Sequence, residues 1–168
     1  MIENLTHLPS LVTFINHINN KDLKETIEEE ITIINHKLKF IVQEGRKSVL
    51  IINHTLAYDS SISPTIKDCI TLCGGQPVDS ITDNPEILLI LADNPSAYGT
   101  LPEMLLDFPF AELSAVKNNQ VYVVNNLNLE NEQEENLLAS IEVLAEIIQP
   151  KYFIFGKNGT DWVQFDLN

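Results

Sequence analysis

Short runs of consecutive apolar residues alternate along the chain with longer segments in which apolar residues recur every three or four positions. Val49–Ile52 is the first such run, and Glu86–Leu91 and Gln120–Val124 carry the next two. Continuous apolar runs of this length are typical of strands that are buried on both faces of a parallel sheet. The pattern therefore predicts three buried strands in these places.

Helices are predicted before and between these strands, because the spacing of apolar residues matches the helical repeat. The longest is Asp22–Gln43, where isoleucines and leucines form one stripe, with glutamates crowded in the first half and lysines in the second. That order of charges complements the helix dipole. Shorter helices are predicted at Leu5–Ile18, at Glu132–Ile148, and at Pro102–Phe108 with Met104, Leu105 and Phe108 turned inward.

The stretch Lys47–Gly75 carries the clearest local signals, and they predict a strand, an exposed loop and a helix. Ser63 is a good helix N-cap, and Pro64 suits the first helical position. Gly74 and Gly75 then end the helix. A loop that follows a parallel strand is where open α/β sheets place their ligands, so a binding site is predicted in this region.

This alternation of strands and helices predicts an α/β fold, a three-layer αβα sandwich with a mostly parallel sheet, preceded by the long helix. The length of 168 residues fits one domain. A joint is expected at Gly45–Arg46, which divides an N-terminal helical segment (1–45) from an α/β lobe (46–168). The tail, around Tyr152–Phe155 and Trp162–Phe165, has the pattern of a hairpin.

The charge balance narrows the range of partners. The chain has 10 Lys and Arg against 24 Asp and Glu, which gives a net charge of −14. Such a balance argues against nucleic acid and anionic membranes as partners. No apolar run reaches the roughly 18 residues of a membrane span, and residues 1–20 lack the pattern of a signal peptide. The expected location is cytoplasmic, or periplasmic only if a leader was removed before Met1.

Polar side chains follow each of the three predicted strands, where they would share one edge of the sheet. They are the candidate ligand-binding residues: His54, Tyr58, Asp59, Asp93, Asn94, Tyr98, Asn125 and Asn126. Histidine is a common metal ligand and tyrosine a known haem ligand, so His54 and Tyr58 could contact a metal chelate, haem iron or a corrinoid. The alternative is that His54 caps a backbone group and Tyr58 packs the loop.

The sequence predicts neither a cofactor nor a metal site of the protein's own. Cys69 and Cys73 lack a second pair of ligands at zinc spacing, and they are expected to be reduced core thiols. No glycine-rich phosphate loop and no nucleophile elbow is present. His54 and Asp59 could be drawn as a base and its orienting group, but a convincing nucleophile is missing. An enzyme is therefore not expected.

Four segments resemble, in order, the C-terminal lobe of the periplasmic substrate-binding proteins that serve ABC importers of iron–siderophores, haem and cobalamin. Asp22–Gln43 is similar to the long helix that joins the two lobes of that family, and Ser48–Gly75 to the strand, loop, helix and Gly-Gly ending that follow it. The most specific match is Ala111–Asn125, AELSAVKNNQVYVVN, and Leu144–Phe153, LAEIIQPKYF, is similar to the closing helix, proline and aromatic residue. The resemblance covers about residues 22–153.

The resemblance implies a non-catalytic protein that binds a small molecule or metal chelate, as one lobe without its partner lobe. Gln76–Pro85 is too short for the helix that carries a permease-docking glutamate in the family, which argues against docking onto an importer. A homodimer across the open sheet edge is expected instead, because a single lobe exposes surface that the family buries. The alternatives are an interaction or scaffold module that lost ligand binding, and an uncharacterised α/β enzyme.

Overall fold

The structure, a computed structural model, describes residues 5–40, 45–54, 58–60, 62–92, 97–125 and 133–167. It contains a five-stranded sheet in the order β2-β1-β3-β4-β5, in which β1 to β4 are parallel and β5 runs antiparallel to β4. The strands are β1 Lys47–Asn53, β2 Gly75–Pro77, β3 Ile87–Leu91, β4 Val121–Val124 and β5 Trp162–Gln164. The predicted α/β class and the three predicted strands are confirmed.

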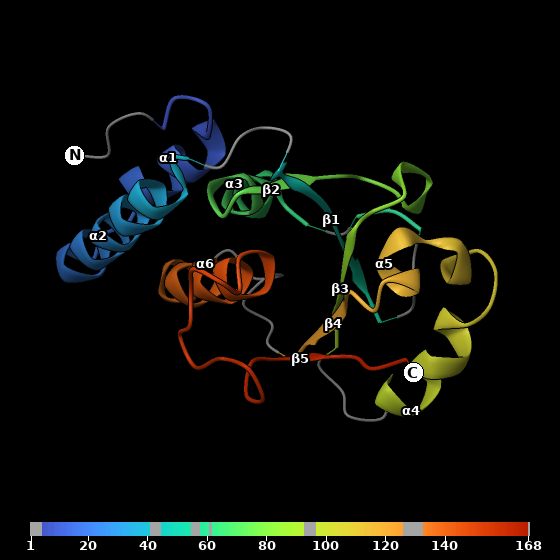
Figure 1. Ribbon diagram of the computed structural model, residues 1–168. Coiled ribbons are helices and arrows are strands. Elements are labelled where there is room, and N and C mark those ends of the chain that lie inside the picture. The colour runs from blue at the N-terminus through green and yellow to red at the C-terminus, as the bar shows by residue number, and fades with distance from the viewer. Residues whose placement is uncertain are drawn as a thin grey trace.

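Helices cover both faces of the sheet, which makes three layers (Figure 1). On the first face, α3 Pro64–Leu72 and α6 Glu134–Ile148 lie next to the sheet, and α1 Pro9–Asn16 and α2 Lys21–Leu38 pack on their outer side. The second face carries α4 Ala97–Leu105 and α5 Ser114–Lys117, with two short 3-10 helices at Ile81–Asp83 and Phe110–Glu112. None of the described helices is long and apolar enough to cross a membrane.

The alternation of side chains along β1 explains why its apolar run is continuous. Val49 and Ile51 point into the layer of α1, α2, α3 and α6, whereas Leu50 and Ile52 point into the layer of α4 and α5. All four side chains are fully buried. A strand with helices on both faces has no solvent side, so apolar residues occupy every position.

The predicted boundaries of α3 are confirmed. The Ser63 hydroxyl accepts a hydrogen bond from Ile66 N at 3.3 Å, and Pro64 takes the first helical position. Gly74 has a φ of +83°, a left-handed conformation that glycine adopts without strain and that ends the helix. Cys69 and Cys73 are buried thiols, as expected for the core.

The long N-terminal helix is present as α2, Lys21–Leu38, and residues 41–43 of its predicted span lie outside the described residues. The Asn20 side chain caps it by accepting a hydrogen bond from Leu23 N at 3.1 Å. The predicted stripe packs in the same core as α3, α6 and the sheet, through Ile27, Ile31, Ile34 and Leu38.

The prediction for Pro102–Phe108 was wrong in its start and in the side that faces the core. Helix α4 begins at Ala97 and contains Pro102. Its buried residues are Leu101 and Leu105, four positions apart on one side of the helix. Met104 and Phe108 therefore point outward, with exposed fractions of 36% and 85%.

The predicted C-terminal hairpin was also wrong. Only the second half forms a strand, β5, and it pairs with β4 instead of with Tyr152–Phe155. The backbone N–H groups of Phe155 and Lys157 donate to the side chain of Glu146, so this part of the tail binds a helix and not a strand.

Candidate functional site at the carboxyl edge of the sheet

The three central strands end at the same level. Asn53, Leu91 and Val124 are register partners across β1, β3 and β4, and Ala92 N donates to Val124 O at 3.0 Å. The residues that follow the strands therefore lie along one edge, where open parallel sheets bind their ligands. Neighbouring strands are about 4.8 Å apart, which places the backbones after β1 and β4 roughly 10 Å from each other.

Two of the candidate residues meet at this edge. The Tyr98 hydroxyl, from α4, donates a hydrogen bond to Asn125 Oδ1, directly after β4. Burial raises the pKa of Tyr98 above its ordinary value, so the hydroxyl keeps its proton and remains a donor at neutral pH.

The C-terminal tail holds Asn125 from its other side. Asn125 Nδ2 donates to the backbone oxygen of Thr160 at 3.4 Å, and Asn125 N donates to that of Asp161 at 2.9 Å. The Asn125 amide is thus fixed between a tyrosine on α4 and the segment that leads into β5.

His54 lies at the carboxyl end of β1 with an exposed side chain. One strand separates it from Asn125 in the sheet order, because β3 lies between β1 and β4. His54 is therefore placed at the predicted edge, on the β1 side of it. Asp93, Asn94 and Asn126 lie outside the described residues.

Tyr58 and Asp59 lie elsewhere, at the β2 side of the sheet. Asp59 forms an isolated antiparallel bridge with Ser80, and Ile81 N donates to Tyr58 O at 2.9 Å. The Tyr58 ring meets that of Phe110 edge-on, with 5.8 Å between the centroids. The structure therefore does not bring these two side chains to Tyr98 and Asn125, and the Tyr58 ring packs, as the alternative interpretation expected.

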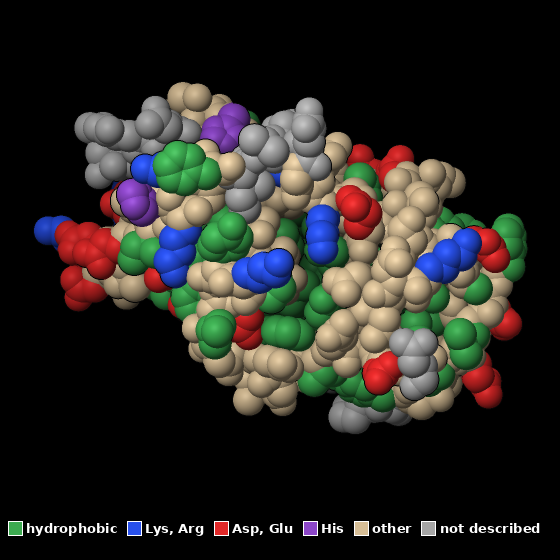
Figure 2. Space-filling view, in the orientation of Figure 1, with side chains coloured by type: hydrophobic (Ala, Val, Ile, Leu, Met, Phe, Trp, Pro, Cys, Tyr) green, Lys and Arg blue, Asp and Glu red, His purple; other side chains and the backbone are tan. Residues whose placement is uncertain are grey.

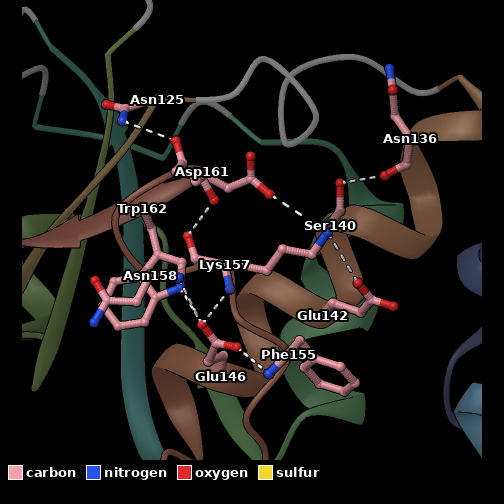
Figure 3. A network of polar contacts seen from close by, with 11 residues as sticks. Asn125, Asn136, Ser140, Glu142, Glu146, Phe155, Lys157, Asn158, Asp161 and Trp162 are labelled. Atoms are coloured by element: carbon pink, nitrogen blue, oxygen red, sulfur yellow. Dashed lines mark hydrogen bonds and ion pairs between the residues drawn. The ribbon is translucent and has the colours of Figure 1, made fainter.

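A buried carboxylate that the sequence analysis missed organises the tail (Figure 3). Glu146, on α6, is only 6% exposed. Its Oε1 accepts hydrogen bonds from Lys157 N (3.1 Å), Asn158 N (3.0 Å) and Trp162 Nε1 (2.9 Å), and its Oε2 accepts one from Phe155 N. Four donors around one carboxylate satisfy it without a cation, which is how an isolated buried charge is tolerated.

Lys157 adds an ionic link between the same tail and α6. Its Nζ lies 3.4 Å from Glu142 and 3.7 Å from Asp161. The backbone oxygen of Asp161 holds Asn125, so the contacts run from α6 through the tail to the candidate edge (Figure 3). The signal in the sequence was an acid, Glu146, inside the apolar stretch of the last predicted helix.

The described part of this edge offers hydrogen bonds and one exposed imidazole. Among the described residues, no three His, Cys, Asp or Glu side chains group closely enough to hold a metal ion. The arrangement suits the binding of a molecule that brings its own polar atoms, or its own metal, to the edge.

No protein-family model matches the chain, and no curated protein matches its sequence. Solved structures do match its fold. An ABC transporter solute-binding protein from Sulfurospirillum deleyianum aligns with a TM-score of 0.60 at 18% identity, over 80% of this chain and 46% of that one. CeuE of Helicobacter pylori, in a Ni-His complex, aligns with a TM-score of 0.56 at 20% identity, over 86% and 51%. Molybdate-bound MolA, a periplasmic binding protein of Haemophilus influenzae, gives 0.58 at 16% identity, over 78% and 44%.

The chain has the fold of one lobe of these periplasmic solute-binding proteins. It spans about half the length of each of the three, between 44% and 51%. The predicted resemblance to this group is therefore confirmed at the level of the fold. At sequence identities of 16% to 20%, the similarity shows a shared fold alone.

Proposed function

We propose that the protein binds a small molecule at the carboxyl edge of its sheet and does not change it chemically. The observation that carries the proposal is the aligned ending of β1, β3 and β4 with the fixed Tyr98–Asn125 pair beside it. A preformed polar group on a rigid sheet edge lowers the ordering cost of binding. The fold similarity to solute-binding proteins supports the same class of function.

The proposed ligand is a metal chelate of little or no negative charge. His54 is an exposed imidazole at this edge and can complete the coordination of a chelated metal. Lys157 is the basic residue placed near Asn125, and it already forms ion pairs with Glu142 and Asp161. The chain also carries a net charge of −14. A strongly anionic ligand would therefore meet repulsion. Cobalamin, an uncharged iron–siderophore and a nickel–histidine complex, as in the CeuE structure, are the candidates of this class, whereas haem carries two propionates and fits it less well.

The test is a thermal-shift and calorimetric screen with these chelates, with molybdate as an anionic comparison. A ligand at 100 times its Kd stabilises the folded protein by about 2.7 kcal/mol. His54→Ala and Asn125→Ala should each weaken binding at least about tenfold, whereas His36→Ala, which removes an exposed histidine from α2, should not. The proposal fails if none of the chelates binds, or if the edge variants bind as tightly as the wild type.

An interaction module is the second candidate, and the exposed end of α4 favours it. Leu106 and Phe108 have exposed fractions of 59% and 85%, which is unusual for two large apolar side chains so close in sequence. A homodimer, expected from the sequence, stays a prediction. The outer face of α2, and not the sheet edge, is the surface that we propose for it.

A further inference from the structure

Helix α2 has two different faces. One face is buried in the core through Ile27, Ile31 and Ile34. The opposite face is exposed, yet it carries two large apolar side chains, Ile33 with an exposed fraction of 48% and Phe40, just past the helix end, with 82%. Exposed apolar residues on the outer face of an otherwise well-packed helix suggest a contact with another surface.

The charges on this outer face are divided between its two halves. The first half is mainly acidic, and a shallow trough of about 520 Å³ runs along it, lined by Glu25, Glu28, Glu29, Thr32 and Ile33. Lys21, at the start of the helix, lies 3.9 Å from Glu25, but both side chains are exposed, so this pair is weak. The second half carries His36 and Lys39, and Lys39 Nζ lies 4.9 Å above the ring of Phe40. Figure 2 shows acidic side chains gathered toward the outer end of this helix, with one basic side chain at the tip and further basic side chains nearer the body of the molecule.

The basic half of α2 itself carries no acid, since residues 31–40 contain no Asp or Glu. Lys37 Nζ donates to the backbone oxygen of Tyr152 at 3.1 Å, which joins it to residues 147–160, a second range without Asp or Glu. The acids that contact this second range are paired or buried: Glu142 and Asp161 lie at Lys157, and Glu146 is 6% exposed. In a protein with a net charge of −14, this is a place where an acidic partner meets local attraction. The first half of α2 on a second copy is such a partner.

We propose that two copies of the chain associate through α2, with the two helices antiparallel about a two-fold axis that passes between Thr32 and Ile33. A two-fold contact uses the same face twice, so the acidic half of each helix faces the basic half of the other. Because the two halves of the outer face differ in charge, two α2 helices are complementary to each other when they lie antiparallel and are not when they lie parallel.

The rise of the helix determines which residues meet. At 1.5 Å per residue, Glu29 and His36 lie about 5 Å from the axis on opposite sides, so each faces the other across the interface. Glu25 and Phe40 lie at about 11 Å, with Lys39 beside them. Phe40 of one copy therefore enters the trough at Glu25 of the other, and Lys39 pairs with that carboxylate. Every contact occurs twice, and the Ile33 side chains meet at the centre.

The dimer is expected to be weak. A contact along a single helix of 18 residues buries less than the roughly 1,200 Å² of a standard stable interface. The net charge of each copy also opposes association at long range. We therefore expect a Kd between about 0.05 and 1 mM at physiological salt, in rapid exchange.

The experiment measures the molecular mass by sedimentation equilibrium from about 10 µM to 1 mM, for the full chain and two variants. The acidic-end variant carries Glu25→Lys and Glu29→Lys, and the basic-end variant carries His36→Glu and Lys39→Glu. Each variant alone should dimerise at least about tenfold more weakly, because like charges then face each other. An equimolar mixture of the two should form a heterodimer, because the two new lysines of one variant then face the two new glutamates of the other.

A control variant, Glu103→Lys with Glu135→Lys, makes the same change of net charge as the acidic-end variant at exposed positions away from α2. It should dimerise as well as the wild type or better. Circular dichroism shows whether each variant is folded, since all four α2 positions are exposed. The proposal is overturned by a wild type that stays monomeric at 1 mM, by a dimer that neither end variant weakens, or by a mixture that forms no heterodimer. A dimer that only the sheet-edge variants disturb would assign the interface to that edge.

Discussion

Removing the Glu146 carboxylate should detach the C-terminal tail from α6 and weaken the whole fold. Four N–H groups donate to this side chain, three of them from the backbone and one from Trp162. A buried donor left without a partner costs about 1–3 kcal/mol, and water can reach some of the four after truncation. We therefore expect Glu146→Ala to lower the free energy of unfolding by about 3 kcal/mol.

Glu146→Gln separates the loss of acceptors from the loss of volume. Glutamine keeps the shape of the side chain but replaces one acceptor oxygen by an NH2 group, which must then face a backbone or indole donor. The expected loss is about 2 kcal/mol. A change of 1 kcal/mol shifts the Tm of a domain of this size by about 2–4 °C, so both variants are measurable.

Urea unfolding gives the global effect, and two local observables give its origin. Trp162 is the only tryptophan, so its fluorescence reports the tail directly. Amide exchange at Lys157 and Asn158 should accelerate in both variants, because these N–H groups lose their acceptor. Glu135→Gln, at an exposed position of the same helix, is the control and should change stability by less than about 0.5 kcal/mol. Unchanged stability and exchange in Glu146→Gln would refute the account of the tail.

Three further predictions follow from burial. Gly75→Ala should lower the free energy of unfolding in urea by about 1–3 kcal/mol, because a Cβ there lies within 3.3 Å of three apolar side chains. In Gly99→Ala the new Cβ meets no atom within 4 Å, so this control should be neutral or stabilising. Equal effects of the two substitutions would contradict this packing. Leu105→Ala should lower the free energy of unfolding by about 2–5 kcal/mol and Met104→Ala by less than about 1, since Leu105 is fully buried and Met104 is 36% exposed. A comparable loss in the two variants would contradict this and favour the predicted orientation, in which Met104 faced inward beside Leu105. Burial raises the pKa of Tyr122 in the folded protein above its unfolded value of about 10. Its contribution to stability is therefore complete below about pH 10 and falls as the pH rises further, because the unfolded chain loses this proton first. Between about pH 9 and pH 11, Tyr122→Phe should lose less stability than the wild type.

The strands and helix boundaries were predictable because their signals are local. A run of consecutive apolar residues such as Val49–Ile52 predicts a strand that is buried on both faces, and this signal does not depend on the rest of the chain. The structure places helices on both faces of that strand. The Ser63 cap and the left-handed Gly74 act through hydrogen bonds and backbone angles within one or two turns of α3. The stripe of α2 is equally local, and all three features appear where they were predicted.

The face of α4 and the course of the tail were not predictable in this way. In α4, several apolar residues compete for one buried side, and the packing surface of β1 and β3 selects Leu101 and Leu105 over Met104 and Phe108. In the tail, the hairpin pattern competes with Glu146, which is 9 to 16 residues away in sequence and offers acceptors at the right distance from four donors. The spacing of apolar residues within each segment indicates neither the buried side of α4 nor the binding of the tail to Glu146.

The candidate edge shows the same division. The sequence by itself determined that polar residues follow parallel strands, and strand register then places His54 and Asn125 on one edge. Only the tertiary structure decided that Tyr98 joins Asn125, while on the β2 side Asp59 pairs with Ser80 and the Tyr58 ring packs against Phe110. Strand order and long-range hydrogen bonds depend on which segments pack together, and that choice is made by the whole core and not by any one segment.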